Sequence, residues 1–359
     1  MCPMRNPERS SCHSAAYDAG GGESVALSTR GRSGKRKADQ QGSAVNRKNR
    51  AQGVVSKLST AIEYPFNKDG YRYFLAECDP NAPNRHLLDE SVEHAGKPIP
   101  SQSYRIVRPS SITMSANDRA PQIKLSNEGL TATGDKGYCV VRGTHDVVRG
   151  TWFYEVKVDS QPKDSHARIG WSQSLGVLQG PVGYDVFSYS MRSLHGTRFH
   201  KSVGKHYGSP YSEGDILGVL IHLPESVGSP PHLPSSGKNL PLIKFKSCCY
   251  FEEKDDPVRT QKTQKPLKGS KIVYYINGVS QGIAFSDIYD ARYFPAVSLY
   301  KNMTITVNFG PKFVYPPEDM LFSPMSDRVE AINIEQCLSD ILYFVCGQEN
   351  SSKHYSLPS

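Results

Sequence analysis

Cysteine and histidine are the residue types that could hold a metal or act as nucleophile and base, and their spacing fits neither role. The eight cysteines form no C-x-x-C pair, which is the spacing on which zinc sites are built. His195, His200 and His206 are close in sequence, but steps of five and six residues suit neither a helix face nor a hairpin ligand pair. We therefore expect no metal site, and free thiols throughout.

Motifs that carry chemistry in enzymes are also absent from the sequence. It contains no G-x-S-x-G, no G-x-x-x-x-G-K-[ST] and no H-E-x-x-H. The glycine run 20–22 lies in a polar segment, where no helix follows to receive a phosphate. The sequence therefore predicts a binding module with no catalytic residues and no cofactor.

The net charge of +8 is concentrated at the N-terminus. Residues 1–60 hold 11 Lys and Arg against 4 Asp and Glu, whereas the rest of the chain holds 32 against 31. Residues 1–60 are also poor in periodic hydrophobicity, so we expect a disordered basic tail. Its two basic clusters are typical of a nuclear-import signal, and they could also contact DNA phosphates nonspecifically. The alternative is a solvated basic tail that no receptor recognises. The clusters consist of Lys35, Arg36, Lys37, Arg47, Lys48 and Arg50.

Residues 61–120 change character, because an aromatic, turn-rich stretch at 64–74 replaces the polar tail. Four prolines between 80 and 100 argue against a long helix. We expect an ordered arm that lies against a domain.

Short strands then follow one another, with no helices between them. Residues 303–309 alternate between apolar and polar side chains, and residues 216–221 are apolar on both faces, as in a central strand. Asn277-Gly278 separates two further runs and is the pair that a two-residue type I′ hairpin prefers. The pattern predicts an all-β fold, an antiparallel β-sandwich over 121–325, with a mobile insertion at 224–270 around one strand near 242–251.

The C-terminus changes to a helical period. Apolar residues follow one helix face at Ile334, Cys337, Leu338, Ile341, Leu342 and Val345. Asp327 and Glu330 offer a capping box, and Gly347 a helix end. We expect an amphipathic helix over 326–346, whose apolar face either binds a partner or packs on the chain's own sheet.

Two parts of the sequence, residues 118–155 and residues 167–185, carry short phrases that resemble a known family. Residues 118–125, 134–138 and 150–155 read DRAPQIKL, GDKGY and GTWFYE, and residues 167–173 and 181–185 read ARIGWSQ and PVGYD. These phrases look like a SPRY domain. Together with 243–246 and 307–311 they closely resemble the Ash-two (absent, small, or homeotic discs two) family, over about 64–345.

The resemblance implies a β-sandwich subunit, without enzymatic activity, of the COMPASS or mixed-lineage-leukaemia complexes that methylate lysine 4 of histone H3. It implies binding of an acidic segment of a retinoblastoma-binding-protein-five-like subunit, and of a Dumpy-thirty-like dimer, to stimulate a separate SET-domain methyltransferase. The implied acidic-peptide residues are Tyr138, Arg168, Pro181, Tyr184 and Arg192, and the implied Dumpy-thirty contacts are Leu338, Leu342 and Val345. Guanidinium groups beside phenol rings suit a carboxylate ligand.

Animal members of this family carry a zinc-containing PHD-like and winged-helix region that this chain does not show. DNA reading through that region is therefore not implied for it.

The expected location is the nucleus. No stretch approaches the roughly 18 apolar residues of a membrane span, and no secretory signal is recognisable, so we expect a soluble, intracellular protein. The alternative is a generic SPRY adaptor unrelated to methylation, although no RING or coiled-coil pattern precedes the domain.

Overall fold

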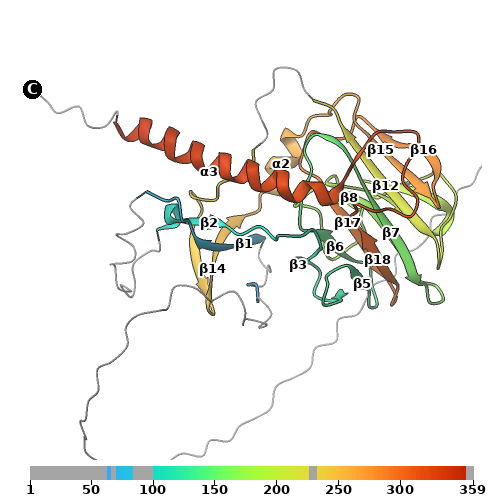
Figure 1. The fold of residues 1–359 in the computed structure, drawn as a ribbon. Helices are drawn as coiled ribbons and strands as arrows, with labels where there is room; N and C mark the ends of the chain where they lie inside the picture. Colours follow the sequence, from blue (N-terminus) through green and yellow to red (C-terminus); the bar gives the residue numbers. More distant parts are fainter. Residues whose placement is uncertain (1–62, 66–69, 84–99, 226–232, 353–359) are drawn as a thin grey trace, which may run out of the picture. The chain divides into compact units, whose positions relative to one another are not determined.

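Antiparallel strands make up most of the chain that the structure describes (Figure 1). The computed structural model covers residues 63–65, 70–83, 100–225 and 233–352, all of which belong to one unit, residues 62–359. Among these residues, no helix has the length and apolar character needed to cross a membrane.

The first layer is a seven-stranded sheet in the order β11-β10-β9-β8-β17-β6-β3. Its strands are β3 (Met114–Arg119), β6 (Cys139–Gly143), β8 (His166–Ser172), β9 (Ser188–Arg192), β10 (Thr197–His200), β11 (Val203–His206) and β17 (Phe294–Tyr300). The sandwich thus begins at β3, somewhat before the predicted residue 121.

The second layer is an eight-stranded sheet in the order β16-β15-β12-β7-β18-β5-β4, with β19 paired to β7 beside this path. Its strands are β4 (Lys124–Leu125), β5 (Thr131–Thr133), β7 (Gly150–Ser160), β12 (Ile216–Leu223), β15 (Lys271–Ile276), β16 (Val279–Ser286), β18 (Thr304–Asn308) and β19 (Ser323–Pro324).

The core lies between these two sheets and follows the sequence alternation. Val156 of β7, Val307 of β18 and Ile169 of β8 are all fully or almost fully buried in one cluster. The intervening Thr304 and Thr306 face outward and are only partly buried. The predicted antiparallel β-sandwich is therefore confirmed.

β12 is apolar on both faces because both faces are covered. Val219 belongs to the sandwich core, whereas Leu220 lies on the opposite face with Phe153 and is packed by Phe313 and Phe322 of the chain that follows β18. This agrees with the expectation of a central strand.

The predicted hairpin at Asn277-Gly278 is also confirmed. Both residues have positive φ, 49° and 84°, and Ile276 pairs directly with Val279 across the turn. Positive φ at both positions is the requirement of a type I′ turn, which Asn and Gly meet at the lowest cost.

A separate four-stranded sheet, in the order β13-β14-β1-β2, joins the predicted arm to the predicted insertion. Its strands are β1 (Tyr71–Cys78), β2 (Tyr104–Ile106), β13 (Leu242–Phe245) and β14 (Cys248–Lys254). The single strand predicted near 242–251 is wrong, because the chain turns at Lys246, which has a φ of 54°. That the insertion is mobile stays a prediction.

Helices are few among the described residues. The insertion holds the short α2 (Pro257–Thr263), three-residue 3-10 turns occur at Ser101–Ser103, Leu194–Gly196 and Met325–Asp327, and α3 (Arg328–Ser352) closes the chain. The C-terminal helix is thus present, but its predicted end at Gly347 is wrong, since α3 continues to Ser352.

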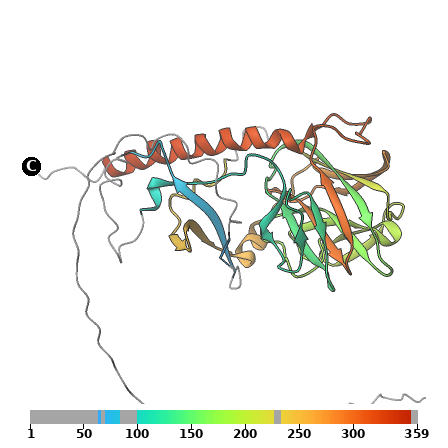
Figure 2. The same ribbon diagram turned by 60° about the horizontal axis from the view of Figure 1, so that its bottom comes forward.

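Figures 1 and 2 show α3 running alongside the four-stranded sheet. Polar contacts hold it there: Gln336 donates to the carbonyl of Ser235 at 3.1 Å, and the Ser339 hydroxyl donates to that of Pro234 at 2.7 Å. The ammonium group of Lys238, fully buried, pairs with Asp79 at 2.6 Å and lies 4.7 Å from the ring centroid of Phe344.

Candidate functional site: an arginine notch and an outward helix face

Strands β8 and β9 place two arginines side by side. Arg168 is the direct cross-strand partner of Arg192, and opposed residues in an antiparallel pair have Cβ atoms about 5 Å apart. Among the described residues, neither guanidinium forms an ion pair with a carboxylate. Two adjacent cations without a counter-charge are unfavourable in the free protein and favour an anionic ligand.

Phe199 of β10 supports both cations from the neighbouring strand. The Arg168 Cζ atom lies 3.6 Å from the centroid of the Phe199 ring, and the Arg192 Cζ atom lies 5.2 Å from it. Cation–π contact of this kind holds a guanidinium in place without neutralising it. The ring of Phe199 therefore holds both cations in place, and Arg192 Nε also donates to the Leu194 carbonyl at 3.3 Å, while both positive charges stay uncompensated.

Tyr138 supplies a second aromatic ring beside Arg168. Its ring centroid is 5.3 Å from the Arg168 Cζ atom, and it stacks on Tyr300 at 5.0 Å with an interplanar angle of 25°. Burial raises the pKa of the Tyr138 phenol, and the nearby Arg168 only partly offsets this. The hydroxyl therefore remains protonated at neutral pH and can donate to a carboxylate. We call Tyr138, Arg168, Arg192 and Phe199 the arginine notch.

Burial also acts on the arginine itself. It lowers the pKa of the Arg168 guanidinium, an effect opposed by Tyr138 and reinforced by the positive charge of Arg192. The Arg168 Nε atom is buried without a hydrogen-bond partner. A buried donor that lacks an acceptor costs free energy in the free protein.

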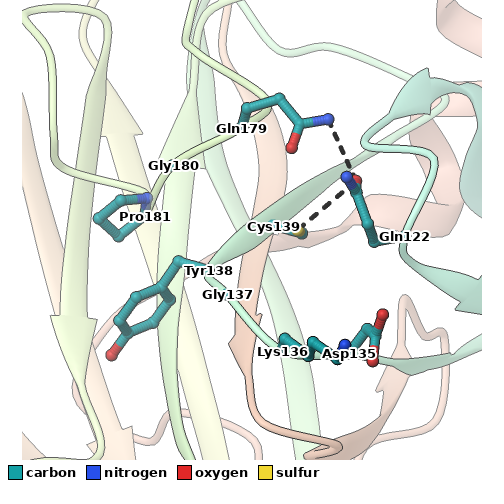
Figure 3. A pocket seen from close by; sticks show the side chains of 9 residues that line it. All are labelled: Gln122, Asp135, Lys136, Gly137, Tyr138, Cys139, Gln179, Gly180 and Pro181. Atoms are coloured by element: carbon teal, nitrogen blue, oxygen red, sulfur yellow. Dashed lines mark hydrogen bonds between the residues drawn. The ribbon is translucent and has the colours of Figure 1, made fainter. Parts of the chain in front are cut away.

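The loop between β8 and β9 supplies a wall next to the notch. Pro181 and Tyr138 line one cavity of about 590 Å³, together with Gln122, Asp135, Lys136, Gly137, Cys139, Gln179 and Gly180. Figure 3 shows Tyr138 and Pro181 on the same side of this cavity, and the linked amides of Gln122 and Gln179 on the other. The cavity adjoins the notch at Tyr138, and its lining combines apolar surface with amide groups and the charged residues Asp135 and Lys136.

Gly183 lets this loop lie against β10. Its φ is +84°, and a Cβ atom there would lie 2.5 Å from the carbonyl oxygen of Phe199. Only glycine combines that backbone conformation with so close an approach. The loop that carries Pro181 is thereby held against the strand that carries Phe199.

A second surface lies on α3, where the apolar stripe faces outward. Exposed fractions are 43% for Leu338, 41% for Leu342 and 54% for Val345, with Ile334 and Ile341 also exposed. The face of α3 turned to the protein is partly polar instead, with Gln336 and Asp340 buried beside Ile332. The helix thus packs on its own chain, as the alternative expected, but it does so through the opposite face, and the apolar stripe stays largely exposed.

Comparison with known proteins agrees with this architecture. The SPRY domain family matches residues 151–227. The Set1/Ash2 histone methyltransferase complex subunit ASH2 of Drosophila melanogaster is 52% identical over 284 residues, which are 79% of this chain and 51% of that protein. The chain belongs to the Ash-two family.

Other Ash-two proteins match over a similar extent. The Set1/Ash2 histone methyltransferase complex subunit ash-2 of Caenorhabditis elegans is 42% identical over 299 residues, 80% of this chain and 51% of that protein. The Set1 complex component ash2 of Schizosaccharomyces pombe is 29% identical over 318 residues, 78% and 46% respectively. The chain thus spans about half the length of the curated relatives it matches.

In this Ash-two chain, the structure brings together most of the acidic-peptide residues expected from the sequence. Tyr138, Arg168 and Arg192 converge on the notch, and Pro181 shares a cavity with Tyr138. Tyr184 lies on the same loop, where its amide donates to the Pro181 carbonyl at 3.1 Å. Its side chain is 55% exposed and makes no ring contact with either arginine among the described residues.

Phe199 was missed by the sequence analysis of this Ash-two chain. Its role follows from its position across from Ser190, two residues along the same strands from the Arg192–Thr197 pair and therefore on the same face of the sheet. That register depends on the 3-10 turn Leu194–Gly196, which no turn motif announces.

The remaining predictions concern other parts of the Ash-two chain. His200 stacks on Tyr189 at 4.1 Å, whereas His195 and His206 are exposed. No group of three metal-ligating side chains occurs among the described residues, where the six cysteines are free thiols. The basic clusters 35–37 and 47–50 lie outside the described residues.

Proposed function

We propose that this chain is a non-catalytic, nuclear subunit of a histone H3 lysine 4 methyltransferase complex. In this role it binds an acidic segment of a retinoblastoma-binding-protein-five-like subunit, and a Dumpy-thirty-like dimer, and so stimulates a separate SET-domain enzyme. Membership of the Ash-two family supports the assignment, because its relatives are named as Set1/Ash2 complex subunits.

The observation that carries the acidic partner is the uncompensated pair Arg168 and Arg192. Each can form a forked, charge-assisted hydrogen bond to a carboxylate, worth roughly 1.5–3 kcal/mol. Tyr138 adds a neutral phenol donor, and the cavity beside Pro181 leaves room for the chain that follows the acidic side chain. The rest of the body is close to neutral, so recognition is local.

The test is binding of a synthetic Glu- and Asp-rich peptide to the full chain, measured by calorimetry. Arg168→Ala and Arg192→Ala should each weaken binding at least tenfold. Arg198→Ala is the matched control. Arg198 lies in the same sheet, two strands from Arg168, but in the strand register it opposes Met191 rather than Arg192, so its side chain lies on the other face of β10 from Phe199. Wild-type affinity in both notch variants would exclude the acidic-segment role.

The α3 stripe supports the second contact. An amphipathic helix that turns its apolar face outward fits a hydrophobic groove formed by other helices, with anchors spaced four and three residues apart. Replacing Leu338, Leu342 and Val345 with Ala should abolish capture of a Dumpy-thirty-like dimer. The exposed Asn333→Ala is the control on the same helix, and undiminished capture by the triple variant would exclude this site.

The generic SPRY adaptor remains the competing function, and a methyltransferase assay separates the two. Added to the SET-domain enzyme and its other subunits, the chain should raise the rate of methyl transfer to histone H3, whereas the chain alone should transfer none. Peptide binding without stimulation would favour the adaptor. Turnover by the chain alone would overturn the non-catalytic assignment.

The basic tail completes the proposal. Clusters 35–37 and 47–50 have the composition of an import signal that also contacts DNA phosphates nonspecifically. Neutralising both clusters should shift a fluorescent fusion from nucleus to cytoplasm, and unchanged nuclear accumulation would exclude the import role.

A further inference from the structure

A buried arginine lies behind the loop that forms the wall of the notch. Arg142 of β6 is 2% exposed. Its Nε and Nη2 atoms donate to the two carboxylate oxygens of Asp118, each at 2.6 Å. This forked pair fixes the plane of the guanidinium and compensates its charge.

The remaining donors of Arg142 all point to the start of the β8–β9 loop. Nη2 also donates to the Ser174 carbonyl and Nη1 to the Gly176 carbonyl, each at 2.9 Å. Nη1 further approaches the Ser172 hydroxyl at 3.4 Å. A guanidinium has five N–H groups, and here every one of them has an acceptor.

Gly176 permits this arrangement. A Cβ atom at this position would lie 2.5 Å from the Ser172 hydroxyl oxygen and 3.2 Å from Arg142 Nη1. Because residue 176 has no side chain, the loop backbone can come within hydrogen-bonding distance of the guanidinium.

A second arginine reaches the same loop from the four-stranded sheet. Arg72 of β1 donates to the Ser174 hydroxyl at 2.7 Å, and pairs with Asp255 at 2.5 Å and with Glu253 at 3.0 Å. Ser174 is thus held at its carbonyl by Arg142 and at its hydroxyl by Arg72. The loop is attached at this residue both to the sandwich and to the arm.

The held segment leads directly to the wall of the notch. After Gly176, the amide of Val177 donates to Asp185 at 2.7 Å, and the Leu178 carbonyl accepts from Val140 at 2.9 Å. Leu178 packs with Val140 and Val182. Pro181 follows within a few residues, and Tyr138 directly precedes β6, the strand that carries Arg142.

We infer that Arg142 and Arg72 are positioning residues for the acidic-segment site. They hold residues 174–176 from behind, and thereby fix Pro181 and its neighbours relative to Tyr138 and Arg168. This inference rests on the proposed function, and it adds that the arm contributes to recognition without touching the ligand. Neither arginine lines the cavity beside the notch.

The test measures peptide affinity in variants of the full chain. Arg142→Lys keeps a charge for Asp118, but three donors on a single nitrogen cannot keep the forked pair with Asp118 and also reach both loop carbonyls, so affinity for the Glu- and Asp-rich peptide should fall about tenfold. Ser174→Ala removes only the Arg72 contact, so affinity should fall about twofold to threefold. Arg105→Lys alters an exposed ion pair of the same four-stranded sheet with Glu77 and should have no effect.

Hydrogen exchange at the amides of 174–178 provides the second readout. Faster exchange there in both variants, with the salt dependence of binding unchanged, is expected of a positioning role, because Arg168 and Arg192 still supply the charge. A generally destabilised protein would exchange faster throughout. If Arg142→Lys does not fold, Ser174→Ala decides the role of Arg72, and Asp118→Asn, which weakens the forked pair that orients the Arg142 guanidinium, decides the role of Arg142 by the same two readouts.

The outcomes separate this inference from the proposed function. If the wild-type chain does not bind the peptide, the proposed function fails. If the wild-type chain binds, Arg168→Ala does not, and Arg142→Lys and Ser174→Ala bind like wild type, then only the positioning role is overturned.

Discussion

Replacing Arg192 with Gln should separate the binding role of the notch from its stability. Arg192 directly opposes Arg168 across β8 and β9, and like charges in that position destabilise a sheet by roughly 0.2–1 kcal/mol. The variant removes this repulsion. It also removes a long 3.3 Å hydrogen bond from Arg192 Nε to the Leu194 carbonyl and a 5.2 Å contact with Phe199, worth together about 0.5–1 kcal/mol.

These contributions nearly cancel in the free protein. The free energy of unfolding of Arg192→Gln should therefore lie within about 0.5 kcal/mol of wild type. Binding is different, because a lost charge-assisted contact costs roughly 1.5–3 kcal/mol, or about 10- to 150-fold in Kd. The variant should be a normally folded protein with a severe binding defect.

Two measurements on the same preparations test this expectation. Urea denaturation gives the free energy of unfolding, and calorimetric titration with the Glu- and Asp-rich peptide gives Kd, with Arg198→Gln as the control. A loss of more than about 2 kcal/mol of stability would mean that Arg192 is structural. Unchanged affinity would mean that the carboxylates lie elsewhere, and either result would refute the reasoning.

Three further predictions concern the surroundings of the site and the core. Phe199→Leu should weaken peptide binding about threefold to fivefold in the same titration, because Arg168 loses the ring 3.6 Å from its Cζ atom; equal affinity would show that the ring does not orient the cation. Burial lowers the pKa of His145 from 6.5 to about 4. Between pH 6.5 and pH 4 the unfolded chain therefore binds more protons than the folded chain. The free energy of unfolding should fall by about 3 kcal/mol as the pH drops through this range. His145→Asn should remove that part of the pH dependence, and an identical slope in urea titrations would contradict it. Glu155→Gln should lower the free energy of unfolding by about 2–4 kcal/mol. The carboxylate is 1% exposed and accepts hydrogen bonds from the backbone amides of Tyr315 and Val314 and from the side-chain amide of Asn308, at 2.7, 3.0 and 3.1 Å. A cost under about 0.5 kcal/mol in urea denaturation would show that the glutamine amide satisfies the same donors.

The sheets could be predicted because their signals are local. Alternation at 303–309 and the Asn277-Gly278 turn follow from the pleat of a strand and from the φ values that these two residues tolerate. The turn at Lys246 could not be predicted in this way, since a lysine at positive φ has no sequence signature, and β13 and β14 were therefore expected as one strand.

The helix shows the same division. Its apolar stripe was visible in the sequence, but the direction in which the stripe points depends on polar contacts with Ser235 and Pro234, which are about a hundred residues away. Gly347 did not end α3, since a glycine inside a helix costs only about 1 kcal/mol. Arg142 and Arg72 likewise carried no signal, because their partners come from three stretches that lie far apart in the sequence, residue 118, residues 172–176 and residues 253–255.

The outward stripe of α3 also affects the steady-state amount of this protein in a cell. Leucine, isoleucine and valine side chains left open to water invite self-association and capture by the chaperones and proteases that remove unassembled chains. Overproduction of this chain by itself should thus yield aggregates or rapid turnover, while co-production with the molecule that covers the stripe should restore it. Its abundance would then follow the supply of that companion more closely than its own rate of synthesis.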